Sequence, residues 1–354
     1  MSEVLETAPV RLGEELDWAS LENYLRQNIE GLDGEFSVLQ FPNGSANLTY
    51  LVSFGGRKLV VRRPPFGALA PGAHDMGREY RTLSRLWRGY DRAPRALLFC
   101  ESPDVIGAKF LVVEYRSGVV IWSEIPLSMA LVPDVARKIG FAVVDALAEL
   151  HSVEPAAVDL ADLGRPAGFL ERQLAGWRKR WDLVAEANGD GQAELLSDRL
   201  VERMPVSGSP AIVHNDFKID NCQFAPGEPD RVVSVFDWDM ATIGDPLVDL
   251  GTLLNYWPDP SDGGDGALAV PGLEKLGLPT RAEVVARYRQ SSGRELGDID
   301  WYEAYGCWKT IVILQQLYAR YLRGETTDPR MGERGEQVKG LTRRALSVLD
   351  RTTT

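Results

Sequence analysis

The pattern of apolar residues changes once along the chain, near residues 117–118, and this change constrains the fold more than any other feature. Before it, short apolar runs separated by turn residues such as Gly55-Gly56 predict an antiparallel sheet, joined in part by hairpins and carrying one helix. After it, longer segments with apolar residues at helical spacing predict a mostly helical part. We therefore expect an α+β fold of two lobes, with a small β-sheet lobe at 1–117 and a larger helical lobe at 118–354.

The same patterns predict individual elements. In the first part we expect strands at 36–41, 48–54, 58–63, 96–100 and 110–114, and helices at 17–30 and 76–87. In the second part we expect helices at 133–150, 169–188, 193–204, 249–256, 281–292 and 301–323, with short strands at 211–213, 221–224 and 232–236. A cleft between two lobes is a common place for a ligand, so functional residues are sought where the lobes meet.

Composition excludes several classes of function. The 354 residues carry a formal net charge of −12, which disfavours broad binding of nucleic acid or of an anionic membrane surface. Three widely spaced cysteines and three histidines disfavour a disulfide framework and a Cys- or His-rich zinc site. The N-terminus lacks the pattern of a signal peptide, and the apolar stretch at 301–318 is interrupted by charges, so we expect no membrane span and a cytoplasmic protein.

The strongest chemical signal lies where two predicted strands end. An apolar strand ends at Val213 and is followed by a polar loop that holds Asp216 and Asn221, and a second apolar strand leads to Asp237. Two carboxylates and an amide offer the hard oxygen ligands that suit Mg²⁺. Phosphoryl transfer needs such a metal site, a carboxylate for the attacking hydroxyl and a cation for the moving phosphoryl group, and Lys218 could supply that cation.

Here the sequence resembles a known family. The run His214-x-Asp216-x-x-x-x-Asn221 resembles the catalytic loop of the protein-kinase-like superfamily. Asp237-Trp238, followed by Gly244-Asp245-Pro246-x-x-Asp249-Leu250, is similar to the aminoglycoside phosphotransferase branch, which includes choline kinase. Within that branch the chain looks closest to the kinase-like domains of acyl-CoA dehydrogenase family members 10 and 11. The resemblance spans about residues 36–320 and implies a bilobal protein-kinase-like fold.

The resemblance also implies roles for single residues. Asp216 would be the catalytic base, Asn221 and Asp237 would hold Mg²⁺, and Lys218 would contact the γ-phosphate. The ATP site would be completed by Ser45 and Asn47 in the phosphate-covering turn, Arg62 and its helix partner Glu79, and Glu114 and Tyr115 in the hinge. His214 is expected to hold the loop by hydrogen bonds, and Asp249 to cap a helix or brace the loop.

Two positions depart from the superfamily pattern. Arg62 stands where the third strand usually carries lysine; it keeps the charge but is longer, so the nucleotide pose is open. The turn after the first strand has a single glycine, Gly44, instead of a glycine-rich run. We still expect Arg62 and Glu79 to form an ion pair between strand and helix.

The expected activity is ATP- and Mg²⁺-dependent phosphorylation of a hydroxyl group on a small molecule. The acceptor stays open between a hydroxyacyl compound, which the closer resemblance favours, and an aminoglycoside- or choline-like cation, which suits an acidic protein. Two other classes are kept: a non-catalytic nucleotide-binding regulator, and a metal-dependent phosphoester hydrolase, which would need more carboxylates or histidines near Asp237. The sequence leaves open the oligomeric state and the choice between ATP and GTP.

Overall fold

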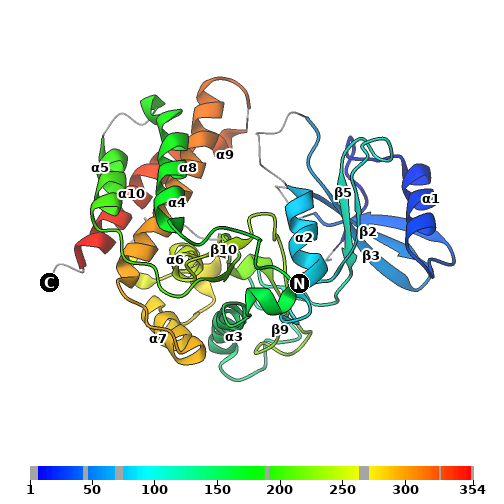
Figure 1. The fold of residues 1–354 in the computed structure, drawn as a ribbon, viewed down its shortest axis with the longest axis horizontal. Coiled ribbons are helices and arrows are strands. Elements are labelled where there is room, and N and C mark those ends of the chain that lie inside the picture. The colour runs from blue at the N-terminus through cyan, green and yellow to red at the C-terminus, as the bar shows by residue number, and fades with distance from the viewer. Residues whose placement is uncertain are drawn as a thin grey trace.

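The computed structural model describes residues 7–42, 47–67, 75–187, 191–262, 271–326 and 328–351. The described chain has two halves, an antiparallel sheet flanked by helices on the right of Figure 1 and a helical assembly on the left. This is the mixed fold predicted from the sequence pattern.

The N-terminal sheet has five strands in the order β1-β2-β3-β5-β4, and all neighbouring pairs are antiparallel. Its strands are β1 (Phe36–Gln40), β2 (Leu48–Phe54), β3 (Arg57–Arg63), β4 (Ala96–Cys100) and β5 (Phe110–Glu114). The predicted hairpin at Gly55-Gly56 is confirmed, since Phe54 pairs with Arg57 across this two-residue turn. Gly55 has a φ of 55°, which glycine adopts without steric cost.

Two helices, α1 (Trp18–Asn28) and α2 (Met76–Leu86), lie on opposite faces of the sheet (Figure 1). Leu21 and Leu25 of α1 pack into a core formed with the sheet. The buried face of α2 instead belongs to a larger core that continues through the helical half. The two halves are therefore joined by shared apolar packing as well as by the chain.

The helical half contains α3 (Val135–Leu150), α4 (Phe169–Asp182), α5 (Gln192–Glu202), α6 (Leu247–Tyr256), α7 (Arg281–Ser292), α8 (Ile299–Leu322), α9 (Pro329–Gly332) and α10 (Arg334–Arg351). Short strands β6 (Val119–Val120), β8 (Cys222–Phe224) and β9 (Val232–Val235) form one antiparallel sheet, and β7 (Ala211–Val213) pairs with β10 (Thr242–Gly244) in another. No helix in the described ranges combines the length and the apolar character needed to cross a lipid bilayer.

Some predicted boundaries move for local reasons. The helix expected from residue 133 begins at Val135, because Asp134 adopts a left-handed conformation with a φ of 55° just before it. The helix expected to reach residue 188 ends at Asp182 and is followed by a short 3₁₀ turn, Ala185–Ala187.

Helices α6 and α8 approach each other unusually closely through two glycines. A Cβ atom added to Gly251 would lie 2.0 Å from the Tyr302 carbonyl oxygen, and one added to Gly306 would lie 2.4 Å from the Gly251 carbonyl oxygen. Backbone thus faces backbone at this crossing. The crossing matters for function because both helices carry polar side chains that reach the loop after β7.

Candidate active site

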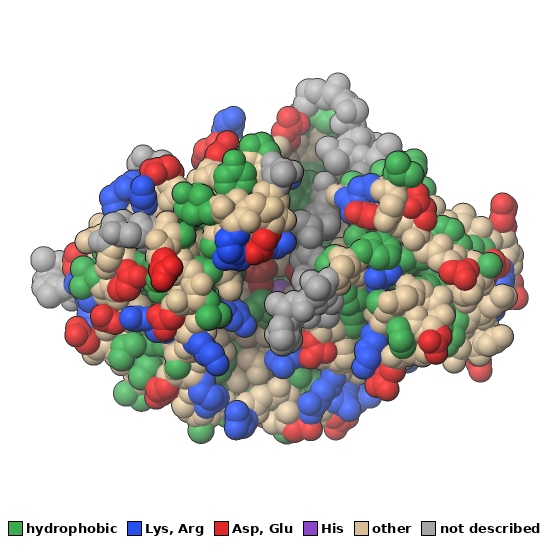
Figure 2. Space-filling model, turned by 90° about the horizontal axis from the view of Figure 1, so that it is seen from above, with side chains coloured by type: hydrophobic (Ala, Val, Ile, Leu, Met, Phe, Trp, Pro, Cys, Tyr) green, Lys and Arg blue, Asp and Glu red, His purple; other side chains and the backbone are tan. Residues whose placement is uncertain are grey.

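A cavity of about 460 Å³ lies between the sheet half and the helical half. From above, the surface is hollowed between the two halves (Figure 2). The predicted site residues that line it are Asn47, Arg62, Glu79, Glu114, Tyr115, Asp216, Lys218, Asn221 and Asp237. Ser45, also predicted to contact the nucleotide, lies outside the described residues. The structure therefore brings together side chains from distant parts of the sequence.

The loop after β7 is fixed from below by the Asp249 carboxylate of α6. Its two oxygens accept hydrogen bonds from the backbone N–H groups of His214 and Asn215, both at 2.6 Å. The buried His151 ring lies 3.2 Å from the same carboxylate. Burial alone would raise the pKa of Asp249, but these hydrogen bonds and nearby histidines hold it below its usual range. The loop-bracing role expected for Asp249 is confirmed.

His214 fixes the loop from inside. Its Nε2 lies 2.7 Å from the Phe236 carbonyl oxygen, which can only accept, and its Nδ1 lies 3.2 Å from the Asp216 N–H, which can only donate. Both contacts fit one neutral tautomer with the proton on Nε2. His214 therefore joins the loop to the strand end before Asp237, and the expected structural role is confirmed.

A buried lysine of α8 completes this support. The Lys309 ammonium donates to the Asn215 carbonyl oxygen and lies 3.4 Å from the Thr252 hydroxyl of α6. The Asn215 carbonyl belongs to the peptide bond that precedes Asp216. Burial lowers the pKa of Lys309, and the nearby carboxylates of Asp216 and Asp249 oppose that shift. Sequence reasoning noted Lys309 only as a charge inside an apolar helix, and that interruption was the available signal.

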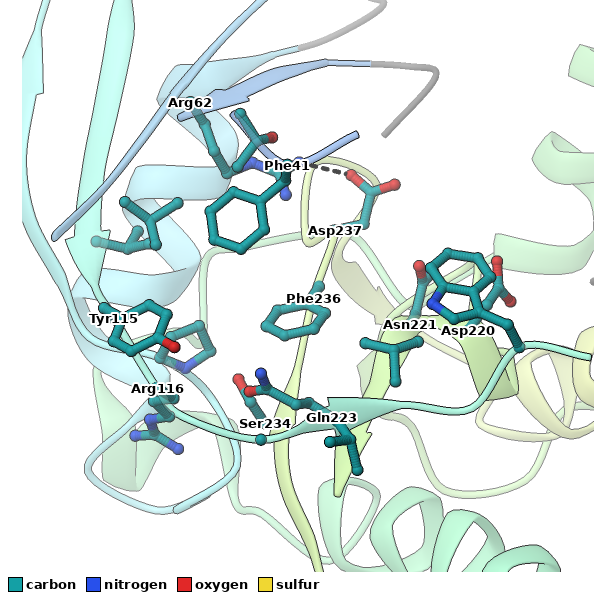
Figure 3. Close-up of a pocket in the computed structure, with 18 of the residues that line it drawn as sticks. Phe41, Arg62, Tyr115, Arg116, Asp220, Asn221, Gln223, Ser234, Phe236 and Asp237 are labelled. Atoms are coloured by element: carbon teal, nitrogen blue, oxygen red, sulfur yellow. Dashed lines mark hydrogen bonds and ion pairs between the residues drawn. The ribbon is translucent and has the colours of Figure 1, made fainter. Parts of the chain in front are cut away.

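The two strand ends meet as the sequence predicted. The Asn221 side-chain amide donates to the Asp216 carbonyl oxygen at 2.9 Å, and the Phe236 N–H donates to the Asn221 carbonyl oxygen at 2.9 Å. Asp237 follows in a left-handed conformation with a φ of 67°. Figure 3 shows Asn221, Asp220 and Asp237 together at one end of the cavity. A short chain of hydrogen bonds therefore connects Asp216 with the strand that carries Asp237.

Arg62 of β3 contacts two acidic groups. Its Nε lies 3.2 Å from Glu79 Oε1 of α2, which confirms the predicted ion pair, and its Nη2 donates to Asp237 Oδ1 at 2.8 Å. Burial raises the pKa of Glu79 to about 7, although the guanidinium opposes that shift. Burial would also raise the pKa of Asp237, but Arg62 and other nearby cations lower it. Arg62 thus ties the sheet half to the metal-ligand candidate of the other half (Figure 3).

Lys218 lies between two carboxylates. Its Nζ is 3.2 Å from Asp216 Oδ2 and 3.7 Å from Asp220 Oδ2. Burial would lower the pKa of Lys218, but the two carboxylates raise it well above its usual range. The ammonium is therefore charged and stands beside the candidate base.

The polar residues fit a divalent cation by their charge. Among the described residues that line the cavity, six are acidic (Glu79, Glu114, Glu124, Asp216, Asp220 and Asp237) and three are basic (Arg62, Arg116 and Lys218). Burial raises the pKa of Asp220 to about 6; it also raises that of the neighbouring Asp239 to about 7, with help from the charges of Asp237 and Glu79. Crowded buried carboxylates of this kind are stabilised by a bound cation.

The described ranges contain no group of three or more His, Cys, Asp or Glu side chains placed to hold a metal ion. A site built from one carboxylate and one amide leaves coordination positions for water and phosphate oxygens. Asn221 and Asp237 are the residues that would hold the ion.

The hinge segment, residues 114–118, connects β5 to β6 at the other end of the cavity. Arg116 fixes this segment, because its Nε donates to Glu114 Oε1 at 2.7 Å and its guanidinium reaches the carbonyl oxygens of Ala93 and Val233, both at 3.0 Å. The Lys58 ammonium lies over the Tyr115 ring, 5.2 Å from the ring centre. Sequence reasoning missed Arg116, because the Ala93 and Val233 carbonyl oxygens that fix it lie far away in the sequence.

Residues 37–304 match the sequence model of the phosphotransferase enzyme family. The chain is 30% identical over 355 residues to acyl-CoA dehydrogenase family member 11 of Gallus gallus, covering 98% of this chain and 45% of that protein. It is also 30% identical to family member 10 of Mus musculus, covering 96% of this chain and 32% of that protein. The chain thus spans less than half the length of these relatives.

Solved structures show the same fold. A Ralstonia eutropha protein assigned to the aminoglycoside phosphotransferases superposes with a TM-score of 0.78 at 28% identity, covering 95% of this chain and 99% of that one. Choline kinase from Cryptosporidium parvum superposes with a TM-score of 0.58 at 12% identity, covering 95% and 96%. An aminoglycoside 2′-phosphotransferase-IIIa in complex with GDP gives 0.60 at 15% identity, covering 93% and 99%. The protein-kinase-like fold expected from the sequence is confirmed.

Proposed function

Because the chain belongs to the phosphotransferase enzyme family, we propose that it transfers the γ-phosphoryl group of ATP, with Mg²⁺, to a hydroxyl group of a small molecule. The observation that carries this proposal is the convergence of Asp216, Lys218, Asn221 and Asp237 in one cavity between the two halves. We further propose that residues 1–117 and 118–354 act as the nucleotide-side and acceptor-side lobes, and that the protein works in the cytoplasm.

Each side chain has a role in this mechanism. Asp216 accepts the proton of the acceptor hydroxyl as the oxygen attacks phosphorus. Lys218 donates to the oxygens of the moving phosphoryl group, and Arg62 neutralises phosphate charge from the sheet half. A bound Mg²⁺ on Asn221 and Asp237 would neutralise β- and γ-phosphate oxygens. Transfer is direct, since Asp216 acts on the acceptor itself and no protein nucleophile is required.

The cavity wall favours an acceptor with an apolar portion. The segment that follows β6, the strand paired with β8, leads into the cavity wall. Trp122, Ile125 and Leu127 all line the cavity. Such a wall suits an acyl chain better than a polycationic sugar. We therefore propose a hydroxyacyl compound as the acceptor, in preference to an aminoglycoside or choline.

A release assay tests the proposal. Purified protein with Mg-ATP is given a panel of hydroxyacyl-CoAs, free hydroxy acids, aminoglycosides and choline, and ADP and phosphorylated product are measured. We expect acceptor-dependent ADP release with a hydroxyacyl compound. ADP release of equal rate with every acceptor, or phosphate release without any acceptor, would point to hydrolysis and contradict the proposed transfer.

Replacing Asp216 by Asn separates chemistry from binding. The amide keeps the size of the side chain but cannot accept the proton, so we expect kcat to fall about 10²- to 10⁴-fold. The dissociation constant for Mg-ATP, measured by calorimetry, should stay within about threefold of the original value, because base catalysis and nucleotide binding use different groups. A fully active Asp216→Asn variant would remove the base assignment.

A second function is kept because of Arg62. Its guanidinium donates directly to Asp237 Oδ1, an oxygen that a metal ion would need. A chain in which this contact persists would bind nucleotide without turning it over, as a non-catalytic regulator. Tight Mg-ATP binding in calorimetry, without product from any acceptor in the panel, would favour this second function.

A further inference from the structure

The cavity has a second end that the phosphoryl-transfer chemistry does not use. Arg62, Asn221 and Asp237 gather at one end, and Tyr115 and Arg116 of the hinge lie at the other (Figure 3). A nucleotide whose phosphates lie beside Asp237 extends its base toward the hinge. The groups at the hinge end are therefore those that would contact the base.

Two polar side chains form the floor of this hinge end. Gln223 of β8 and Ser234 of β9 are direct partners across an antiparallel pair, so their side chains lie on the same face. Both line the cavity, and they are 1% and 0% exposed. Figure 3 shows them side by side, below Phe236 and next to Arg116. An amide and a hydroxyl thus stand where two buried strands would ordinarily carry apolar side chains.

The Ser234 hydroxyl has no hydrogen-bond partner among the described residues. Buried polar groups are almost always hydrogen-bonded, and each exception needs an explanation. The Gln223 side chain lies directly across the strand pair, yet no hydrogen bond joins it to this hydroxyl. A ligand that fills the hinge end of the cavity would supply the missing partner.

Gly118 of the hinge lies in close contact with Gln223. A Cβ atom added to Gly118, at the end of the hinge, would lie 2.6 Å from Gln223 Cγ and 2.6 Å from the Phe224 carbonyl oxygen. Glycine is therefore required where the hinge passes over β8. This close approach seats the hinge directly against the polar floor.

Resting on the proposed function, we propose that Ser234 and Gln223 hydrogen-bond the nucleobase of the phosphate donor and set the preference between adenine and guanine. A hydroxyl and a carboxamide each hold a donor and an acceptor. Adenine and guanine differ in the donors and acceptors on their edges, so a fixed pair of polar groups distinguishes them. Base selection then depends on side chains as well as on the hinge backbone.

Calorimetric dissociation constants test this assignment in the full chain. The variants are Ser234→Ala, Gln223→Leu and the double change, each nearly conserving volume, and the ligands are the Mg²⁺ complexes of ATP, GTP, 2′-deoxy-ATP and tripolyphosphate. The matched control is Ser128→Ala, the same atomic change at an exposed position of the same cavity. Thermal melting of each variant verifies that it folds.

We expect Ser234→Ala to weaken the preferred nucleotide about 5- to 10-fold, the usual effect of one hydrogen bond, while Ser128→Ala does not. Gln223→Leu should change the ratio of ATP to GTP affinity about tenfold. Tripolyphosphate binding should be unchanged in every variant, and 2′-deoxy-ATP should lose the same factor as ATP.

Unchanged ATP and GTP affinities in both variants would overturn the assignment while leaving phosphoryl transfer intact. Losses that disappear with 2′-deoxy-ATP would assign the floor to the ribose and also overturn it. If the unaltered protein bound tripolyphosphate with the same affinity as ATP and GTP, that result would show that the protein does not recognise the base. An original protein that binds none of the four ligands would contradict the proposed function itself.

Discussion

Two residues that flank the reacting groups adopt backbone conformations that side chains usually avoid. Asn215 precedes Asp216 with a φ of 66°, and Asp237 has a φ of 67°. Left-handed conformations at residues other than glycine persist where the surroundings enforce them. Asp249 and Lys309 enforce the first and Arg62 contacts the second. The strain therefore lies where the direction of a carboxylate matters most.

Lys309 is expected to position Asp216 without touching substrate. In Lys309→Met the stem keeps its volume but the Asn215 carbonyl loses a charged donor, so kcat should fall about 10- to 100-fold while the nucleotide dissociation constant stays unchanged. The matched control is Gln315→Met on the same helix, which loses a 3.1 Å hydrogen bond to the distant Val184 carbonyl oxygen. An equal loss of kcat in both variants would contradict the positioning role of Lys309 and leave it a purely structural one.

The residues that the sequence made predictable are those with a local motif. Asp216, Asn221 and Asp237 follow strand ends, so their convergence could be inferred from the chain itself. Lys309 and Ser234 could not, because what defines them is a partner, or the lack of one, contributed by remote segments. Ion pairs between elements, such as Arg62 with Glu79, were predictable only through the family resemblance.

At the scale of elements, the crossing of α6 and α8 supports the loop after β7. Gly251→Ala would drive a Cβ atom into the Tyr302 backbone, which cannot rotate away, so we expect a loss of about 3 kcal/mol in the free energy of unfolding. Gly176→Ala is the control, since Gly176 is exposed on α4 with open space around it. There alanine should stabilise by about 0.5–1 kcal/mol. Urea denaturation measures both, and equal effects would refute the close crossing.

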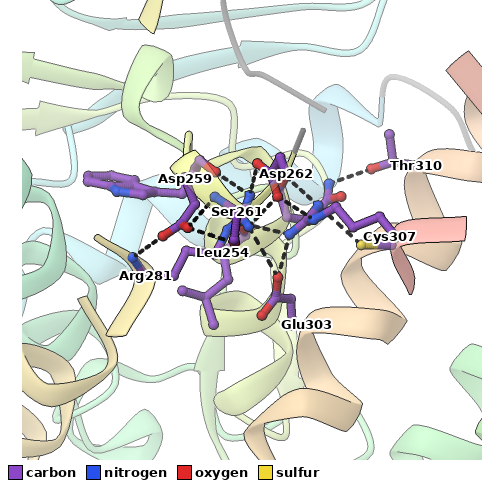
Figure 4. Close-up of polar contacts among 11 residues, drawn as sticks. Leu254, Asp259, Ser261, Asp262, Arg281, Glu303, Cys307 and Thr310 are labelled. Carbon is purple, nitrogen blue, oxygen red and sulfur yellow. Dashed lines mark hydrogen bonds and ion pairs between the residues drawn. The ribbon is translucent and has the colours of Figure 1, made fainter. Parts of the chain in front are cut away.

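A buried ionic network holds α7, α8 and α10 to the segment after α6 (Figure 4). Arg281 contacts Asp262 at 2.6 Å and Glu303 at 3.7 Å, and Arg344 contacts Asp262 at 2.9 Å and also pairs with Glu303. All four side chains are between 5% and 9% exposed. Two cations face two anions, so the loss of any single member leaves one buried charge without compensation.

Removing one member should therefore be costly. Glu303→Ala leaves two buried guanidinium groups with one carboxylate, and we expect the free energy of unfolding to fall by about 3–5 kcal/mol. The double change of Glu303 and Arg344 to Leu retains the Arg281–Asp262 pair and should recover most of that loss. Breaking the exposed pair of Glu336 with Lys339 by Glu336→Ala should leave stability nearly unchanged. If Glu303→Ala lowered the free energy of unfolding as little as Glu336→Ala does, that result would contradict the network.

The elements show the same division between local and remote causes. β2, β4 and β5 have the predicted bounds because turn residues or breaks in the apolar pattern mark both ends. β6, β10 and α10 were not predicted. The two strands are two and three residues long and exist only through their pairing, and α10 owes its stability to packing on α8 and α5.

At the scale of the molecule, charge distribution predicts how the nucleotide binds. The chain carries a net charge of −12, and the described cavity residues add an excess of acids over bases where a polyanion must enter. We expect a chelator to weaken ATP binding at least about tenfold, because one uncompensated charge contact costs roughly 1.4 kcal/mol or more. Calorimetry with Mg²⁺ and with EDTA measures this, and Asp237→Asn should reduce the dependence. Equal affinity in both buffers would exclude a metal role in binding.

The glycine crossing of α6 and α8 has a consequence for altering this protein. Gly251 and Gly306 place the main chain of α6 against the main chain of α8. The positions from which Asp249 and Lys309 reach the loop after β7 are therefore set by the backbone and not by exchangeable side chains. Trp122 and Leu127 belong to another part of the chain, the segment that leaves β6. Directed evolution toward new acceptor alcohols can therefore begin with the segment that leaves β6, because substitutions there do not change the backbone that positions Asp249 and Lys309.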